Sequence, residues 1–178
     1  MQLAAMTLAL VLTGPEVAVG APAPTFSLRT LNPDACGLAW VRLDELVGPS
    51  AQDAGSRVVL LSFFASWCEP CKRELPLLVE LDRTYRDRGL RVISIDIDVE
   101  EAGIEAARAL TAQSGLRHPV GSDRFGVLAR RYLGDRALLP SVFLIRRDGT
   151  IARIDRGYSG EGPAFLAAAV RAELGARP

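Results

Sequence analysis

The stretch that decides the fold is Val58 to Lys72, VVLLSFFASWCEPCK. Its first seven residues, Val58 to Phe64, form a nearly continuous apolar run of strand length, which is typical of a strand buried on both faces of a sheet. The spacing of the apolar residues that follow predicts a helix over Pro70 to Asp87. Proline fits the first turn of a helix, where its missing N–H is not needed. The sequence therefore predicts a strand, a tight turn carrying Cys-x-x-Cys, and a helix.

The two cysteines of this turn form a pair with distinct chemical roles. Cys68 falls at the start of the predicted helix, where unpaired backbone N–H groups and the helix dipole stabilise a thiolate. Cys71 follows one turn later, close enough to close a disulfide. We expect Cys68 to be the exposed member of the pair and Cys71 the less exposed one. The pattern thus predicts a dithiol/disulfide exchanger in which Cys68 attacks and Cys71 resolves the mixed disulfide.

The rest of the chain supplies the other elements of a single domain. Apolar periodicity and turn signals predict helices over 100–114, 125–133 and 163–174, longer strands over 90–99, 141–145 and 150–156, and short strands within 25–28, 40–46 and 118–120. From residue 58 onward, strands and helices alternate until a closing hairpin at Asp148-Gly149. This order predicts an α/β three-layer sandwich with a mixed central sheet.

The segment FFASWCEPCKRELP resembles the active site of the thioredoxin superfamily, most closely the TlpA/ResA-like thiol:disulfide oxidoreductases of bacterial envelopes. The resemblance covers most of residues 22–174, including APTFSL at 23–28, Pro76 inside the helix, and LPSVFLIRRDGTI at 139–151. It implies a thioredoxin-like α/β/α fold, a redox-active disulfide as the only redox group with no other cofactor, and a cis proline against the cysteines at Pro140. It also implies a substrate-binding surface made of Trp67, Glu69, Pro70, Leu139 and Pro140.

Two positions decide how protons would be handled in such a protein. Thioredoxins carry a buried Asp six residues before the first cysteine, and this chain has Ser62 there. ResA-like proteins instead place an acid six residues after that cysteine, which corresponds to Glu74. Glu74 is thus a candidate catalytic acid or base, and a solvated helix turn is the alternative, because the dipole favours acids in either case. Leu139 replaces the Thr often found before the cis proline and leaves the choice of partner open.

The N-terminal residues 1–20 read as a secretory signal. Leu3 to Leu12 is an apolar run that is too short to span a bilayer, and small residues at Ala18 and Gly20 predict cleavage after Gly20. The domain would then comprise residues 21–178, in the periplasm or otherwise exported. Because no basic residue precedes Arg29, the alternative is an N-terminal helix of a cytoplasmic protein. No cysteine follows the run, so a lipid anchor is not predicted.

Composition excludes several other functions. The 21 basic residues balance 21 acidic ones, which argues against a nucleic-acid-binding protein. Cys36, a single cysteine far from the pair in sequence, is interpreted as a bystander, and His118, which starts a predicted strand, as structural. The spacing of the three cysteines and the single His matches no zinc pattern. Haem attachment would need His where Lys72 stands. We expect a monomer without a metal site.

Four functions fit a Cys-x-x-Cys on this fold. The first is an envelope reductant of the cytochrome c maturation type, which exchanges with protein disulfides and receives electrons from a membrane partner. Net oxidation of protein thiols uses the same residues, and only the reduction potential separates the two directions. A peroxiredoxin-like peroxidase would want Thr where this chain has Ala65. A copper or zinc carrier would want a wider cysteine spacing and a dedicated His.

Overall fold

The computed structural model describes residues 17–157 and 162–175, so most of the predicted signal segment, residues 1–16, lies outside the described residues. The strands are β1 (Ser27–Arg29), β2 (Trp40–Arg42), β3 (Val58–Phe64), β4 (Leu90–Asp96), β5 (Val120–Ser122), β6 (Ser141–Arg146) and β7 (Ile151–Arg156). The helices are α1 (Pro33–Cys36), α2 (Glu69–Tyr85), α3 (Glu101–Gln113), α4 (Val127–Leu133) and α5 (Gly162–Gly175), with a 3-10 turn η1 at Arg86–Arg88.

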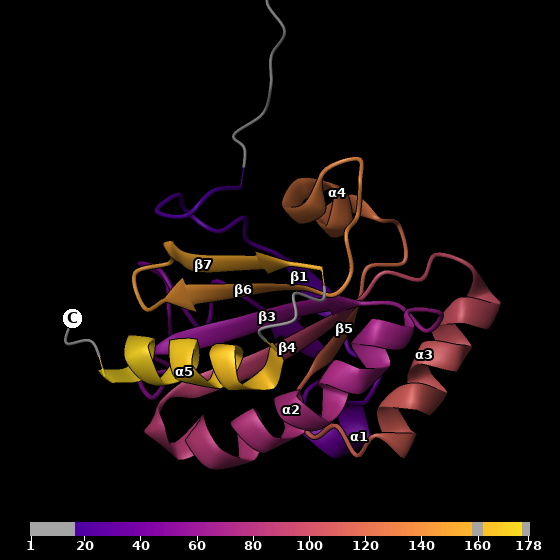
Figure 1. Cartoon of the computed structure of the whole chain (residues 1–178), viewed down its shortest axis with the longest axis horizontal. Coiled ribbons are helices and arrows are strands. Elements are labelled where there is room, and N and C mark those ends of the chain that lie inside the picture. The colour runs from indigo at the N-terminus through magenta and orange to yellow at the C-terminus, as the bar shows by residue number, and fades with distance from the viewer. Residues whose placement is uncertain (1–16, 158–161, 176–178) are drawn as a thin grey trace, which may run out of the picture.

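The central sheet is mixed, as the sequence predicted, and has the strand order β5-β4-β3-β6-β7 (Figure 1). β3 lies in the middle, parallel to β4 and antiparallel to β6. All seven residues of β3 are buried, which explains their continuous apolar character. The loops that follow β3, β4 and β5 leave the same edge of the sheet, because these three strands are parallel. That edge is where the Cys-x-x-Cys turn lies.

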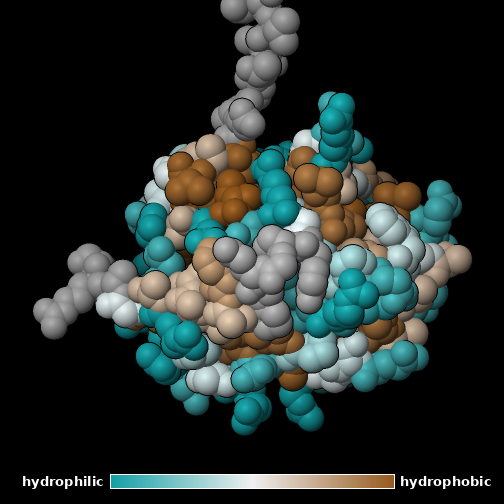
Figure 2. Space-filling model, viewed as in Figure 1, coloured by the Kyte–Doolittle hydropathy of each residue, from teal (hydrophilic) through white to brown (hydrophobic). Residues whose placement is uncertain are grey.

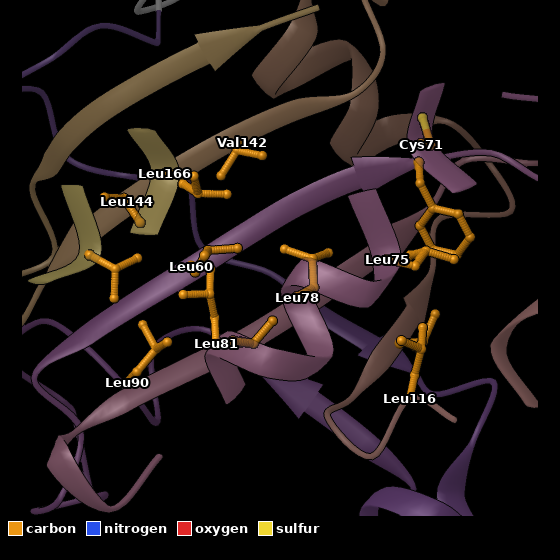
Figure 3. Packing of buried hydrophobic residues seen from close by; sticks show 14 of the residues in the cluster. Leu60, Cys71, Leu75, Leu78, Leu81, Leu90, Leu116, Val142, Leu144 and Leu166 are labelled. Carbon is orange, nitrogen blue, oxygen red and sulfur yellow. The ribbon is translucent and has the colours of Figure 1, made fainter. Parts of the chain in front are cut away.

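One face of the sheet is covered by α2, α3 and α5 (Figure 1). The core on this face contains Leu60 of β3, Leu75, Leu78 and Leu81 of α2, and Val170 of α5. Figure 3 shows this cluster, with Cys71 at one end of it near Leu75. The spacing of the buried leucines is the helical stripe that predicted α2.

The other face is covered by α4, the β1–β2 hairpin and the segment before β1. Three rings form its centre: Phe63 of β3, Tyr132 of α4 and Phe143 of β6, with centroids 5.0–5.7 Å apart. Because consecutive residues of a strand point to opposite faces, Phe63 packs here while Ser62 points toward α2. The three-layer α/β/α architecture is therefore confirmed.

Three local features differ from the sequence prediction. β5 begins at Val120 rather than at His118, and the Pro119 carbonyl accepts the first ladder hydrogen bond, from Ser94 N–H. The short helix α1 was not predicted. Part of the predicted signal segment packs on the domain, because Val17 is only 8% exposed and Gly20 N–H donates to the Ile151 carbonyl. A cut after Gly20 would remove both contacts.

Within residues 17–157 and 162–175, the helices are all too short or too polar to cross a membrane. The space-filling view shows hydrophobic residues gathered at the upper side of the molecule, around α4 (Figure 2). Exposed apolar side chains in that part of the sequence include Phe125 and Val127.

Candidate active site

Cys68 and Cys71 lie at the start of α2 and are joined by a disulfide, with 5.3 Å between their Cα atoms. Cys68 is the N-cap residue of the helix, and its Sγ accepts a hydrogen bond from the backbone N–H of Cys71 at 3.2 Å. Pro70 follows at the second helical position and is half-buried, as expected for a proline in the first turn. The sulfur of Cys68 therefore occupies the position where a helix stabilises negative charge.

The expected difference in burial between the two cysteines exists, but it is small. Cys71 is 1% exposed and Cys68 is 5% exposed, so the expectation of an exposed Cys68 is wrong for the disulfide form. Both cysteines belong to the hydrophobic cluster beneath α2. The exposed residue is the neighbouring Trp67, at 67%. A partner would therefore contact the exposed indole of Trp67 before the buried sulfur of Cys68.

Glu74 lies one turn after Cys71 on the same side of α2, since residues three apart on a helix are neighbours. Its Oε2 accepts a hydrogen bond from the Ser62 hydroxyl at 3.0 Å. Burial raises the pKa of Glu74 from its usual 4.5 to about 7, the Ser62 hydrogen bond acts in the opposite direction, and the charge of Asp155 adds to the rise. The structure thus places the predicted acid against the serine that replaces the thioredoxin Asp.

Glu69 points in the opposite direction, into solvent. Its carboxylate receives a hydrogen bond from Lys72 Nζ at 2.6 Å. This hydrogen bond and the lysine charge lower the pKa of Glu69. Lys72 is therefore held by Glu69 at the surface beside the cysteines, and its charge is partly neutralised there.

Leu139 and Pro140 lie at the base of the active-site turn. The peptide bond between them is cis, as the resemblance implied. The register of β3 and β6 pairs Phe63 with Ser141, so Pro140 lies beside the last residue of β3, where the active-site turn begins. Pro140 is buried and Leu139 is half-buried, and the Pro140 carbonyl accepts a hydrogen bond from Gly157 N–H at 2.7 Å.

A group of buried aspartates behind the turn was missed by the sequence analysis. Asp98 Oδ2 accepts a hydrogen bond from the Ser66 backbone N–H at 2.7 Å, two residues before Cys68. Asp96 is fully buried, and burial raises its pKa to about 8, with the charges of Asp98 and Asp123 adding to the rise. Acidic residues at alternating positions inside an otherwise apolar run, LRVISIDID, were the signal that could have revealed this group.

Two residues considered earlier lie apart from the disulfide. Cys36 is half-buried in α1, and its Sγ lies 3.5 Å from the Leu38 carbonyl. His118 is buried beside Ser94, 2.9 Å from its hydroxyl, and burial lowers the pKa of this imidazole to about 4. Among the described residues, no three His, Cys, Asp or Glu side chains are grouped so that they could hold a metal ion.

The chain is similar in sequence to proteins described as thiol-disulfide oxidoreductases or as thioredoxin-like. "Thiol-disulfide oxidoreductase ResA" of Bacillus thuringiensis subsp. konkukian is 31% identical over 106 residues, which are 60% of this chain and 58% of that protein. The chain thus spans less than two thirds of that relative. "Thioredoxin-like protein YneN" of Bacillus subtilis is 30% identical over 138 residues, which are 78% of this chain and 71% of YneN.

Solved structures and a family model also relate the chain to thioredoxin-like proteins. A candidate thiol:disulfide interchange protein DsbE from Chlorobium tepidum superimposes with a TM-score of 0.73 at 26% identity, covering 90% of this chain and all of that one. A structure from Bacteroides thetaiotaomicron, described as a candidate protein disulfide isomerase, gives a TM-score of 0.72 at 28% identity, over 89% of this chain and 91% of that one. The AhpC/TSA family model matches residues 19–154. The chain therefore belongs to the AhpC/TSA family and has the thioredoxin-like fold.

Proposed function

We propose that this protein is a thiol:disulfide oxidoreductase whose redox group is the Cys68–Cys71 pair. The observation that carries the proposal is a disulfide at the first turn of α2, with the Sγ of Cys68 at the N-cap. The descriptions of the ResA relative and of the DsbE-like structure support it. Relatives that are matched over only part of their length support a reaction class and leave the substrate to be identified.

The reaction can be written with its atoms and electrons balanced. In the reduced protein, the Cys68 thiolate attacks one sulfur of a substrate disulfide, and the other substrate sulfur leaves and takes up a proton. A mixed disulfide then joins Cys68 to the substrate. The Cys71 thiol loses its proton and attacks Cys68 Sγ, which releases the second substrate thiol. The substrate has gained two electrons, and the protein holds the Cys68–Cys71 disulfide.

Glu74 is the candidate acceptor for the proton that Cys71 loses. It lies one helical turn away, and its pKa of about 7 lets it exist in both protonation states near neutral pH, as a general acid or base requires. Trp67, Glu69, Pro70, Leu139 and Pro140 would contact the polypeptide around the reacting disulfide, because they surround the cysteines in sequence or at the base of the turn.

The physiological direction that we propose is reduction in the cell envelope, of the cytochrome c maturation type. The balance above then needs a dithiol donor to reduce Cys68–Cys71 again, and a membrane protein on the electron-donating side would supply it. Net oxidation of protein thiols is the alternative. A reduction potential below about −230 mV for the pair would favour the reductant, and one near −120 mV the oxidant.

Two other functions on the same fold have weaker support. A peroxidase of the peroxiredoxin type would use a Thr hydroxyl three residues before the attacking cysteine, and this chain has the buried Ala65 there. A copper or zinc carrier would need a third ligand near the two sulfurs. Measuring the consumption of hydrogen peroxide tests the peroxidase, and measuring bound copper and zinc tests the carrier. Both measurements use the preparation that reduces insulin.

The decisive experiment assigns roles to the sulfurs. We expect Cys71→Ser to accumulate mixed disulfides with its partners, because attack succeeds and no resolving thiol remains. We expect Cys68→Ser to accumulate few, and Cys36→Ser, the matched control, to behave as the unmodified protein. Thiol trapping, non-reducing gels and mass spectrometry read all three variants. Adducts on Cys68→Ser, or loss of turnover in Cys36→Ser, would overturn the assignment.

A further inference from the structure

A pair of buried carboxyl groups lies directly behind the active-site turn. Asp96 is the last residue of β4 and is fully buried, and Asp98, two residues later, is 6% exposed. The register of β3 and β4 pairs Asp96 with Phe64, so these two side chains point to the same face of the sheet. Phe64 belongs to the hydrophobic cluster that contains Cys68 and Cys71. Asp96 therefore lies on the face of the sheet that carries the disulfide.

Asp98 is enclosed by three segments of the chain. Its Oδ2 accepts the hydrogen bond from Ser66 N–H at 2.7 Å, which joins it to the active-site turn. Its backbone N–H donates to Asp96 Oδ1 at 3.2 Å, which joins it to the end of β4. The first turn of α3 closes the third side, because a Cβ at Gly103 would lie 2.7 Å from Asp98 Oδ1. The Asp98 carboxylate is therefore closely packed between its two hydrogen-bonded neighbours and α3.

One oxygen of Asp96 has no donor. Oδ1 accepts the Asp98 N–H, whereas Oδ2 is buried and receives no hydrogen bond from the part of the chain that the structure describes. A buried, ionised oxygen without a donor is costly. A proton on Oδ2 removes the charge and turns this oxygen into a donor. The Asp98 side chain is close enough to Asp96 to accept that hydrogen bond.

The surroundings of Asp96 also favour its protonated form. Burial raises the pKa of Asp96 to about 8, and the hydrogen bond with the Asp98 side chain and the charges of Asp98 and Asp123 add to the rise. The Asp98 backbone N–H acts in the opposite direction. The disulfide on α2 carries no charge, and Glu101 of α3 is exposed and paired with Arg124. Asp96 is therefore largely protonated at neutral pH.

From this geometry we infer that Asp96 and Asp98 share one proton as an acid–carboxylate pair, and that Asp96 is a positioning residue for the turn that presents Cys68. In the pair, Asp96 Oδ2–H donates to the Asp98 carboxylate, and Asp98 Oδ2 accepts from Ser66 N–H. When the proton is lost to solvent, two carboxylates are in contact and repel each other. The shared proton does not depend on the proposed function, whereas its consequence for disulfide exchange at Cys68 rests on that function.

The pair makes disulfide exchange sensitive to alkaline pH. Once Asp96 is ionised, a second negative charge lies behind the active-site turn, and repulsion pushes the Asp98 carboxylate away from the position in which it accepts Ser66 N–H. A negative charge behind the disulfide also opposes the approach of an attacking thiolate and the departure of a cysteine thiolate. Loss of the shared proton should therefore slow the reaction of the Cys68–Cys71 disulfide with a thiol.

The first test follows the carboxyl groups of the oxidised protein, in which Cys68 and Cys71 do not titrate. The carboxyl ¹³C resonances of Asp96 and Asp98 are recorded by NMR as a function of pH, and Asp96→Asn and Asp98→Asn assign them. We expect both resonances to change together near pH 8, because carboxyls that share a proton titrate as a pair. In Asp96→Asn, whose amide N–H can donate to Asp98 at every pH, this change should vanish. Glu74→Gln, the control, should retain it.

The second test measures what the pair does to the disulfide. Dithiothreitol reduces the unmodified protein and Asp96→Asn side by side at each pH, so that titration of the reagent cancels in the ratio of the two rates. We expect equal rates below about pH 7, and a rate about threefold higher in Asp96→Asn at about pH 9, where only the unmodified protein has gained the charge. Glu101→Gln, which removes an exposed carboxylate at the start of α3, is the matched control and should follow the unmodified protein throughout.

Each contrary outcome has a distinct meaning. Separate titrations of Asp96 and Asp98, or a change near pH 8 that persists at Asp98 in Asp96→Asn, would overturn the shared proton. The titration of the unmodified protein decides this point even if Asp96→Asn does not fold. A constant ratio of the two reduction rates across the pH range would overturn the positioning role. If dithiothreitol does not reduce the Cys68–Cys71 disulfide at any pH, the proposed function fails, and the carboxyl titration still decides the shared proton.

Discussion

The first two turns of α2 have an exposed side and a buried side, and each carries a glutamate. Glu69 lies on the exposed side, bound by Lys72, and its pKa is lowered. Glu74 lies on the buried side, bound to the Ser62 hydroxyl, and its pKa is raised to about 7. Two identical side chains, five positions apart on one helix, therefore have pKa values that change in opposite directions.

The difference shows that the helix dipole does not decide the protonation of these groups. Glu69 is the first residue of the helix, where the dipole favours the ionised form, and Glu74 lies in the second turn, where this effect is weaker. Glu69 has water and an ammonium group as neighbours, whereas Glu74 faces a hydroxyl and the core. Desolvation therefore outweighs the dipole on the buried side. Only Glu74 has an acidity suited to proton exchange with the cysteines near neutral pH.

The largest expected effect that tests this comparison is a change in the pH dependence of stability. A carboxyl whose pKa is raised from 4.5 to about 7 binds its proton more tightly in the folded protein. Its stabilising contribution is therefore complete below about pH 4.5 and is lost as the pH rises through 7, a fall of about 3 kcal/mol in the free energy of unfolding. In Glu74→Gln we expect this part of the fall to vanish.

Urea unfolding of the oxidised protein at pH 4.5 and at pH 8 measures the difference. Asp96 also has a raised pKa, but it is present in both proteins, so its contribution cancels when they are compared. Glu69→Gln is the matched control and should keep the pH dependence of the unmodified protein. Identical pH dependence in Glu74→Gln and the unmodified protein would contradict a buried, protonated Glu74.

A smaller effect on the free energy of unfolding is expected at Asp98. This carboxylate extends the comparison of the two glutamates, because it acts through a hydrogen bond to the active-site turn. Asp98 Oδ2 accepts the Ser66 N–H at 2.7 Å. Asp98→Ala removes this acceptor and leaves an amide N–H without it, which costs about 1–3 kcal/mol. Asp98→Asn keeps an oxygen in place and should lose less than half as much.

The measurement is again urea unfolding, together with the rate at which reduced Cys68 reacts with iodoacetamide. We expect Asp98→Ala to change this rate, because the turn that presents Cys68 loses its anchor. Equal stability and reactivity of the Ala and Asn variants would show that the Ser66 contact does not hold the turn.

The smallest effect is expected at Lys72. Its ammonium group is bound by Glu69 on the solvent side, and exposed ion pairs contribute little in water. Lys72→Met should therefore change the iodoacetamide rate of Cys68 by less than about twofold. A tenfold decrease would instead make the exposed side of α2 a contributor to thiolate formation, and the contrast between the two sides would fail.

The sequence predicted those elements whose pattern is local. Val58 to Phe64 was predicted as a strand and is one residue for residue, because continuous apolar character reflects burial on both faces. The Cys-x-x-Cys at a strand-to-helix turn could also be predicted, because the strand, the proline and the two cysteines all lie within fifteen residues. The cis bond at Pro140 followed from a resemblance to relatives rather than from the residues alone.

What the sequence did not reveal depends on residues far apart in the chain. The pKa of Glu74 depends on burial and on the hydrogen bond from Ser62. Whether Glu74 is a candidate acid or base or a solvated residue could not be decided before the structure placed Ser62 beside it. The contact between Ser66 and Asp98 joins segments 32 residues apart. The packing of β5 against β1 and β2 also joins distant segments, because a Cβ at Gly121 would lie 3.2 Å from the side chains of Leu28 and Val41.

The position of Lys72, which pairs with Glu69 beside the cysteines, also offers a site for a fluorescent label. Lys72 is the only lysine in the sequence, and it lies directly after Cys71. Apart from the terminal α-amine, an amine-reactive fluorophore would therefore have one site of attachment, a side chain about one third exposed at the edge of the redox site. The exposed indole of Trp67 lies directly before the N-cap residue of the same helix and can quench such a dye. A single labelling reaction would thus turn opening and closing of the Cys68–Cys71 bond into an optical signal, without mutating the chain.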